Sequence, residues 1–344
     1  MSKTAVVILN WNGEALLKKF LPVVVENSEY PNVEIIVADN ASTDNSVAFV
    51  EKNFSKVGLI QLDKNYGFAG GYNKALQQVE ADYYLLLNSD VAPEADWLGP
   101  LIKEMDAEPN LGACMPKIRA YNEPDKFEYA GASGGYIDLF GYPFCRGRIL
   151  NSIESDNGQY NEPLPVFWAS GAALMIRSEL YLKAGGLDEA FFAHMEEIDL
   201  CWRIKNMGLD IKILPSSEVL HVGGATLSQQ NAKKTFLNFR NNLLMLVKNL
   251  PSKRLLPILF IRMVLDGIAG LHFISKGEFR HFMAVLKAHF SFYAKLPYVC
   301  RLRKQQASFR VKNAHKEIYP QSIIWAFYIK GLRRFSELKH YHLD

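Results

Sequence analysis

Cysteine is scarce in this sequence, and the four present are widely spaced, at Cys114, Cys145, Cys201 and Cys300. None forms a CxxC pair, which excludes a cysteine-rich zinc site and a dense disulfide framework. The N-terminus also lacks an apolar run long enough for a signal peptide, because Thr4–Leu9 is followed at once by an Asn-Trp-Asn-Gly turn. These absences predict a protein of a reducing, cytosolic compartment.

Two common nucleotide-binding signatures are missing as well. A dinucleotide-binding fold has GxGxxG directly after its first strand, whereas only Gly13 stands there, and the phosphate-binding loop GxxxxGK[ST] is absent. A Gly-rich loop with Arg, typical of nucleotidyltransferases that make sugar nucleotides, does not follow the first strand either. A phosphorylated ligand therefore needs another partner, and a metal ion held by Asp90 is the economical choice.

The composition is that of a folded protein whose charge is divided unevenly. Hydrophobic residues make up 49% and charged residues 22% of the 344 residues, which excludes the disordered and low-complexity classes. Residues 1–232 carry 18 Lys and Arg against 31 Asp and Glu, a net of −13, whereas residues 233–344 carry 21 against 5, a net of +16. This asymmetry predicts two parts with different partners.

The acidic part alternates apolar strands with amphipathic helices. Strands are predicted at Thr4–Leu9, Val33–Ala38, Val57–Leu62 and Tyr83–Leu87. Helices are predicted over residues 14–27 with a kink at Pro22, from a cap at Ser42 to Asn53, over Gly70–Val79 and over Glu94–Asp106. This alternation predicts an α/β fold with a mostly parallel sheet flanked by helices. Ligands of such sheets bind at the carboxyl ends of the strands.

Polar and aromatic side chains follow each of the four predicted strands. The segments are Asn10–Gly13, Asp39–Asp44, Asn65–Gly71 and Asn88–Asp90. Trp11 suits stacking on a base, Asp39 suits accepting a hydrogen bond from a base or ribose, and Asp90 suits a divalent cation. Ordinary turns use the same residue types, but four such turns at one sheet edge favour a site for a flat, phosphorylated ligand.

Taken together, these motifs resemble those of family 2 glycosyltransferases, most closely the bacterial rhamnosyltransferase-like branch. The resemblance covers about residues 4–250. It implies an inverting, metal-dependent enzyme of the GT-A fold that uses a nucleotide-sugar donor. Asn88 departs from the family's Asp-x-Asp motif, which leaves Asp90 as the ligand of Mg²⁺ or Mn²⁺. The residues that the resemblance places on the nucleotide are Asn10, Trp11, Asp39, Asn65, Gly67 and Asn88.

The resemblance continues on the acceptor side. Trp168–Arg177 is similar to the strand that borders the acceptor pocket, so Trp168 and Gly171 are expected to contact the acceptor. Phe191–Arg203 is similar to the run that carries the catalytic base at the start of a helix. The base falls on Glu197, where the family usually has Asp, and Glu196 remains an alternative.

A histidine completes the set of expected metal ligands. His221 lies where the family places a His that often binds the metal, and a neutral imidazole suits Mn²⁺ or Mg²⁺ beside a carboxylate. An inverting displacement needs one general base for the acceptor hydroxyl and a Lewis acid for the leaving diphosphate. We expect the helix dipole to keep the base ionised. Asp199 and Arg203, four residues apart, are expected to form a structural pair.

Three arginines are weaker candidates for phosphate contacts. Arg146 and Arg148 lie in residues 119–165, which Gly residues mark as an irregular insertion, and a solvated surface is the favoured interpretation for both. Arg240, near a helix predicted at Thr235–Val247, is a similar candidate for the donor diphosphate.

The basic C-terminal part is expected to be helical and membrane-associating. We divide the chain into a GT-A domain, residues 1–250, and a helical basic region, residues 251–344. Leu255–Ile274 is long enough to span a bilayer. A central charge costs roughly 2.5–3.5 kcal/mol, so the charges of Arg262 and Asp266 favour a helix on the membrane surface or packed in protein. The basic cluster at Arg301–Lys312 suits anionic lipid at the cytosolic face of the inner membrane, and nucleic acid is disfavoured.

The leading hypothesis is a hexosyltransferase of surface polysaccharide synthesis, with rhamnose suggested by the branch likeness alone. Its expected partners are a nucleotide-sugar donor and a glycan or lipid-linked acceptor. The alternative is a non-catalytic sugar-nucleotide or glycan-binding protein of the same fold, although such a protein is expected to have lost Asp39, Asp90 and Glu197.

Overall fold

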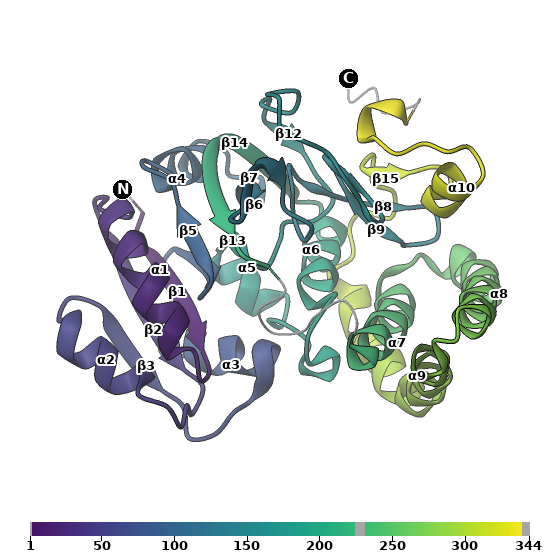
Figure 1. Ribbon diagram of the computed structural model, residues 1–344, viewed down its shortest axis with the longest axis horizontal. Coiled ribbons are helices and arrows are strands. Elements are labelled where there is room, and N and C mark those ends of the chain that lie inside the picture. Colours follow the sequence, from purple (N-terminus) through teal and green to yellow (C-terminus); the bar gives the residue numbers. More distant parts are fainter. Residues whose placement is uncertain (1, 224–230, 339–344) are drawn as a thin grey trace.

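The computed structural model describes residues 2–223 and 231–338 (Figure 1). Its centre is a ten-stranded sheet in the order β12-β14-β6-β13-β4-β1-β2-β3, with β5 added to β14 and β7 to β6. The strands of this sheet are β1 Thr4–Asn10, β2 Val33–Asp39, β3 Gly58–Gln61, β4 Tyr83–Asn88, β5 Val91–Pro93, β6 Leu111–Ala120, β7 Glu123–Phe127, β12 Leu164–Pro165, β13 Ala173–Arg177 and β14 Asp210–His221.

The four strands predicted in the acidic part are confirmed, and they pair in parallel. The β-branched and apolar residues of β1 are buried because β1 lies between β2 and β4. The register places Asn10 opposite Asp39 and Leu9 opposite Asn88. The carboxyl ends of these strands therefore meet at one edge of the sheet. The sheet is mixed, since β13 enters antiparallel between β4 and β6.

Helices flank the sheet on both sides (Figure 1). The predicted helices form with shifted ends, and Pro22 lies within α1 without interrupting it. The predicted cap at Ser42 is wrong, because α2 begins at Ser46 and the Ser42 hydroxyl accepts from Asn12 N at 2.8 Å instead. The helices up to β14 are α1 Glu14–Asn27, α2 Ser46–Asn53, α3 Gly67–Leu76, α4 Leu98–Ala107, α5 Ser178–Lys183 and α6 Glu196–Asn206.

A second, five-stranded sheet draws four of its strands from the segment predicted to be irregular. Its order is β11-β10-β9-β8-β15, and its strands are β8 Gly135–Asp138, β9 Pro143–Cys145, β10 Arg148–Ile149, β11 Ser152–Ile153 and β15 Ile318–Tyr319. The expectation of a solvated surface at Arg146 and Arg148 is wrong, because both are buried. Arg146 donates to the backbone carbonyls of Ser133, Tyr160 and Glu162.

The C-terminal part is largely helical, as predicted. Its helices are α7 Ala232–Asn249, α8 Ser252–Ser275, α9 Phe279–Gln306 and α10 Ile323–Tyr328. Of the described helices, α8 alone is long and apolar enough to cross a membrane by length and composition. Beyond α9 the chain returns to the second sheet, where β15 pairs in parallel with β8. The boundary at residue 250 stays a prediction, because segments from both sides of it build this sheet.

Candidate active site

The ends of β1 and β2 hold a buried carboxylate beside an exposed aromatic ring. Asp39 Oδ1 accepts from Asn10 Nδ2 at 3.0 Å, and Asp39 Oδ2 accepts from Ser42 N at 2.9 Å. Asn10 is itself buried, so it orients the carboxylate and exposes no surface of its own. Trp11 is 54% exposed and leaves its ring free to stack on a flat ligand.

Asn40 fastens the loop before α3 to the end of β2. Its Nδ2 donates to Asn65 Oδ1 at 3.1 Å and to Gly67 O at 3.0 Å, and its Oδ1 accepts from Tyr66 N at 2.9 Å. Gly67 has φ +72°, a left-handed conformation that glycine adopts without strain. Sequence reasoning quoted Asn40 within its motif but gave it no role.

The metal candidates Asp90 and His221 face each other directly. Asp90 Oδ1 lies 3.1 Å from His221 Nε2, and Asn88 Nδ2 lies 3.4 Å from the same nitrogen. Two ligands in neighbouring positions, each at about 2.1 Å from an ion, are about 3 Å apart, so the pair fits one divalent cation. Among the described residues no group of three His, Cys, Asp or Glu side chains could hold an ion.

Glu128 lies behind the imidazole and was missed by the sequence analysis. Its Oε2 is 3.6 Å from His221 Nδ1, on the side of the ring opposite Asp90. Burial lowers the pKa of His221, but the contact with Asp90 and the negative charges of Glu128 and Asp90 raise it to about 10. The two carboxylates therefore attract positive charge to this point. The pairing of Glu128 with His221 joins positions far apart in sequence, so no local motif shows it.

The two candidate bases begin α6 and differ in burial. Glu196 is buried, whereas Glu197 is partly accessible with one carboxylate oxygen, Oε2, sealed from solvent and unpaired. Burial raises the pKa of Glu197 to about 7, and burial together with the charge of Glu197 raises the pKa of Glu196 well above its usual range. The expectation that the helix dipole keeps the base fully ionised is therefore wrong, because desolvation outweighs the backbone N–H groups of this first turn.

The backbone before α6 is held in an unusual conformation. Phe192, His194 and Met195 have φ of +67°, +67° and +74°. Each such non-glycine residue costs of order 1–3 kcal/mol, and strain of this kind clusters at functional sites. A β-carbon placed on Gly67 would lie 3.3 Å from the Phe192 ring, so this segment also borders the loop of Asn65 and Gly67.

Two side chains of α7 clamp this strained segment. The buried amide of Asn241 donates from Nδ2 to the carbonyl oxygens of Phe191, Ala193 and His194 at 3.0, 2.9 and 2.8 Å. Arg240 Nη2 donates to the carbonyls of Ala190 and Phe191 at 2.9 and 3.0 Å. Arg240, expected near the donor diphosphate, is thus engaged by the loop. No sequence motif marked Asn241.

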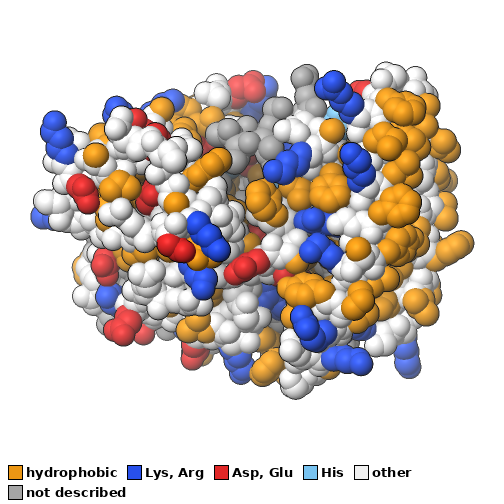
Figure 2. Space-filling view, turned by 90° about the horizontal axis from the view of Figure 1, so that it is seen from below, with side chains coloured by type: hydrophobic (Ala, Val, Ile, Leu, Met, Phe, Trp, Pro, Cys, Tyr) orange, Lys and Arg blue, Asp and Glu red, His pale blue; other side chains and the backbone are white. Residues whose placement is uncertain are grey.

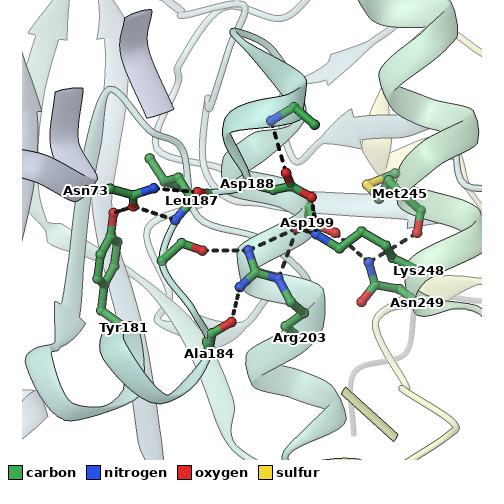
Figure 3. A network of polar contacts seen from close by, with 12 residues as sticks. Asn73, Tyr181, Ala184, Leu187, Asp188, Asp199, Arg203, Met245, Lys248 and Asn249 are labelled. Carbon is green, nitrogen blue, oxygen red and sulfur yellow. Dashed lines mark hydrogen bonds and ion pairs between the residues drawn. The ribbon is translucent and has the colours of Figure 1, made fainter. Parts of the chain in front are cut away.

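A buried charge network fixes α6 to α7 (Figure 3). Asp199 Oδ2 accepts from Arg203 Nε at 2.9 Å, which confirms the expected structural pair, and from Lys248 Nζ at 2.7 Å. Lys248 Nζ also donates to Asp188 Oδ2 at 2.7 Å, and Asn249 Nδ2 donates to Asp199 Oδ1 at 2.7 Å. Two carboxylates thus balance two cations inside the protein, and the direction of α6 is set by this balance.

The two residues expected to contact the acceptor, Gly171 and Trp168, have different surroundings. A β-carbon placed on Gly171 would lie 3.6 Å from the Glu197 β-carbon, so Gly171 lies beside Glu197 with no side chain of its own between them. Asn88 N donates to Ala172 O at 3.0 Å, which joins the end of β4 to this loop. Trp168 is buried, and its indole N–H donates to Tyr136 O at 2.9 Å. The Trp168 ring therefore packs inside the protein and is not exposed.

Comparison with known proteins identifies the family. The family model described as glycosyl transferase family 2 matches residues 5–181, more than half of the chain. The chain belongs to glycosyl transferase family 2. This glycosyltransferase is 27% identical over 234 residues to the N-acetylglucosaminyl-diphospho-decaprenol L-rhamnosyltransferase of Mycobacterium tuberculosis, covering 63% of this chain and 75% of that relative. It is 23% identical over 224 residues to the rhamnosyltransferase WbbL of Escherichia coli, covering 63% and 82%.

Solved structures confirm the GT-A fold of this glycosyltransferase. Staphylococcus aureus TarS 1-349 in complex with UDP-GlcNAc matches with a TM-score of 0.56 at 18% identity, covering 90% of this chain and 88% of that one. The mannosyltransferase PcManGT of Pyrobaculum calidifontis, in complex with GDP-Man and Mn²⁺, matches with a TM-score of 0.52 at 16% identity, covering 91% and 87%. At these identities the likeness concerns the fold alone.

Proposed function

We propose that this glycosyltransferase inverts the anomeric centre in a single displacement on a nucleotide-sugar donor. The observation that carries this proposal is a series of neighbouring groups from the metal candidates to Glu197. His221 faces Asp90 and Asn88, Asn88 N bonds to Ala172, and the neighbouring Gly171 lies beside Glu197. A leaving group held at one end and a base at the other are what a one-step inversion needs.

Asp90 and His221 would hold the divalent cation, Mg²⁺ or Mn²⁺. Their 3.1 Å separation suits neighbouring ligand positions, and Glu128 behind His221 orients the ring as second-sphere carboxylates do. The bound ion supplies Lewis-acid stabilisation to the departing diphosphate. The Mn²⁺ in the PcManGT complex supports the choice of a divalent cation.

Glu197 is the base in this proposal, and Glu196 supports it. Glu197 is the more accessible of the two and lies beside Gly171 on the acceptor side. Glu196 is buried with Oε2 unpaired, and burial together with the charge of Glu197 raises its pKa, which favours its protonated form. The proton of the acceptor hydroxyl passes to the Glu197 carboxylate as the oxygen attacks the anomeric carbon.

Lys234, in the first turn of α7, is proposed to meet the donor diphosphate. Its ammonium group lies 5.8 Å from the centre of the Tyr129 ring. Burial lowers the pKa of Lys234, and the charge of Glu128 acts in the opposite direction. Burial, together with the charge of Lys234, lowers the pKa of His194 to about 4. Lys234 is therefore a partly buried cation that interacts electrostatically with both Glu128 and His194, and a bound diphosphate would neutralise it.

The nucleotide is proposed to lie along the ends of β1 and β2. Trp11 offers the stacking face, Asp39 the acceptor oxygens, and the loop of Asn65 and Gly67 a fixed backbone. The UDP-GlcNAc bound to TarS and the GDP-Man bound to PcManGT support a nucleotide-sugar donor without deciding base or sugar.

The acceptor is proposed to be a hydroxyl of a lipid-linked glycan in surface polysaccharide synthesis. The name of the Mycobacterium tuberculosis relative gives a polyprenol-linked acceptor, and a Myxococcus xanthus relative is named an O-antigen biosynthesis protein. Gly171 would border this acceptor. The buried Trp168 would contribute indirectly, by supporting the chain that leads to Gly171. Such an acceptor places the enzyme at the cytosolic face of the inner membrane, with residues 1–250 catalytic and residues 251–344 on the membrane side.

The test is release of nucleoside diphosphate from a panel of nucleotide sugars with Mg²⁺, Mn²⁺ or a chelator. We expect that one donor is hydrolysed slowly and that its hydrolysis depends on the metal ion. When acceptor is added, the product should have the inverted anomeric configuration. Tight donor binding without any turnover would instead support the non-catalytic binding protein.

A further inference from the structure

Helix α8 buries its central charged side chains and exposes apolar ones, the reverse of an ordinary surface helix. Arg262 and Asp266 are 2% and 1% exposed, and they point into the protein. Arg262 Nη1 donates to Phe140 O at 3.2 Å, and Asp266 Oδ2 lies 3.2 Å from His289 Nε2. From residue 256 to residue 271 no exposed side chain of α8 is polar or charged. The charges that argued against a membrane-spanning helix in the sequence therefore lie on the protein side.

The exposed apolar residues form one continuous face on α8 and α9, which we name the α8–α9 face. Their spacing of three and four residues places them along one side of each helix. In Figure 2 hydrophobic side chains gather along the right-hand edge of the molecule, where this helix pair lies. The members of the face are Leu256, Phe260, Ile261, Val264, Ile268, Leu271, Ile274, Phe279, Met283, Leu286, Phe290 and Tyr293.

The surroundings of this face are basic. Residues 252–306 contain ten Lys and Arg against two Asp and Glu, and of these two acids Asp266 is buried. The exposed cations near the face are Lys253, Lys276, Arg280 and Lys287. By contrast, the cluster predicted to bind lipid is partly used inside the protein, because Arg303 donates to Val247 O at 2.7 Å and Arg310 to Lys248 O at 3.2 Å.

We propose that the α8–α9 face lies in the plane of an anionic membrane, with its apolar side chains at the boundary between headgroups and acyl chains. A broad apolar stripe rimmed by cations is the composition that binds such an interface. A second copy of the chain is a poorer occupant, because a symmetric pairing would bring the two basic rims together. Crossing the bilayer is excluded because the other side of α8 carries Arg262 and Asp266 and packs on the domain.

This inference rests on the proposed function in one respect. A lipid-linked acceptor would be the reason for the enzyme to bind a membrane. In Figure 1, α7 lies between α6, which carries the base, and the α8–α9 pair. Because α7 also clamps the loop before α6 through Asn241, the face that meets the membrane is mechanically tied to the catalytic segment.

The test is co-sedimentation with vesicles of equal parts phosphatidylglycerol and phosphatidylcholine, and with phosphatidylcholine alone. The full chain is compared with the double variant Phe260→Glu, Ile268→Glu and with the control Leu182→Glu, which changes an equally exposed residue of α5. The double variant should lose affinity by roughly tenfold or more per apolar side chain. The full chain and the control should bind the acidic vesicles, more weakly at high salt.

Insertion has a second, independent readout. A cysteine at residue 268 in a Cys300→Ser background carries an environment-sensitive dye, since the other three cysteines are buried. Blue-shifted emission on adding acidic vesicles supports the face, and unchanged emission overturns it. If the double variant does not fold, Leu271→Gln with Phe290→Ser makes the same comparison.

Failure of this inference is distinguishable from failure of the proposed function. Equal binding by the full chain and the double variant overturns the α8–α9 face, whatever the activity. A concentration-dependent dimer abolished by the double variant, without vesicle binding, overturns it in favour of a second copy. Vesicle binding with no donor turnover keeps the face and rejects the enzymatic proposal.

Discussion

The side-chain amide nitrogen of Asn241 lies 2.8 Å from the backbone carbonyl oxygen of His194. The same nitrogen contacts two further carbonyls of the segment that leads into α6. A helix remote in sequence thereby holds the strained backbone from which the proposed base projects. The backbone that leads to Glu197 is thus held by Asn241, a residue of another helix.

Replacing Asn241 tests this dependence. Asn241→Leu removes the side-chain donor from the carbonyls of Ala193 and His194, whereas Phe191 O keeps Arg240, and we expect a stability loss of about 1–3 kcal/mol by denaturant unfolding. We expect kcat to fall on the order of a hundredfold, since misplacing a reacting group is costly even when substrate binds. The matched control is Asn242→Leu, whose Nδ2 donates to Gly141 O away from the loop. An equal loss of kcat in both variants would assign Asn241 a merely structural role.

The base assignment predicts a split between two neighbouring variants. Glu197→Gln keeps the side-chain shape but cannot accept the proton, so transfer should stop while donor affinity, measured by calorimetry, changes little. Glu196→Gln should retain transfer, because the raised pKa of Glu196 favours its uncharged form, which the amide matches in charge. The reverse pattern would move the base to Glu196.

The acidic limb of the pH profile should report Glu197. Its pKa of about 7 means that the ionised base is lost as pH falls, so kcat/KM should drop about tenfold per pH unit below 7 and level off above. Phosphate release from the nucleoside diphosphate product, followed in a coupled assay, measures this profile. A rate that stays constant from pH 5 to 8 would contradict a base with this environment.

Metal affinity should depend on three side chains to different degrees. Asp90→Ala and His221→Ala should each remove Mn²⁺ binding in the presence of nucleotide, measured by electron paramagnetic resonance. Glu128→Gln should weaken it by roughly 10–100-fold, the usual effect of losing an outer carboxylate. The control is Glu154→Gln, which removes a carboxylate that contacts Tyr160 instead. Unchanged Mn²⁺ affinity in Glu128→Gln would remove Glu128 from the metal surroundings.

The charge network between α6 and α7 predicts a large loss of stability. Lys248→Met leaves Asp188 and Asp199 buried with one cation fewer, and breaking a buried pair in this way costs about 3–5 kcal/mol. Urea unfolding measures the loss. Lys18→Met, which removes an exposed pair with Glu14, should cost less than about 1 kcal/mol.

Local patterns were sufficient for the N-terminal half of the sheet. The apolar runs of β1, β2 and β4 and the polar turns after them predicted both the strands and the sheet edge at which Asp39 and Asn88 lie on either side of β1. The family motifs added His221, whose position opposite Asp90 follows from the pairing of β14 with β5.

Long-range contacts explain what the sequence could not predict. Glu128 and Asn241 act on His221 and His194 through the folded chain, and neither stands in a motif. The strands of the second sheet are two to four residues long, too short for a periodic pattern to show. The raised pKa of Glu197 depends on how fully α6 is covered, and spacing alone says nothing about that.

The pairing of β15 with β8 joins Ile318 to Ile137. During synthesis the second sheet cannot close until residue 318 has left the ribosome, although the central sheet up to β14 is complete long before. The edge of β8 therefore stays open for the time taken to translate residues 138–318, and an open edge is a site of mispairing. We expect the α8–α9 face to emerge within this interval, so folding and arrival at the membrane would overlap in time.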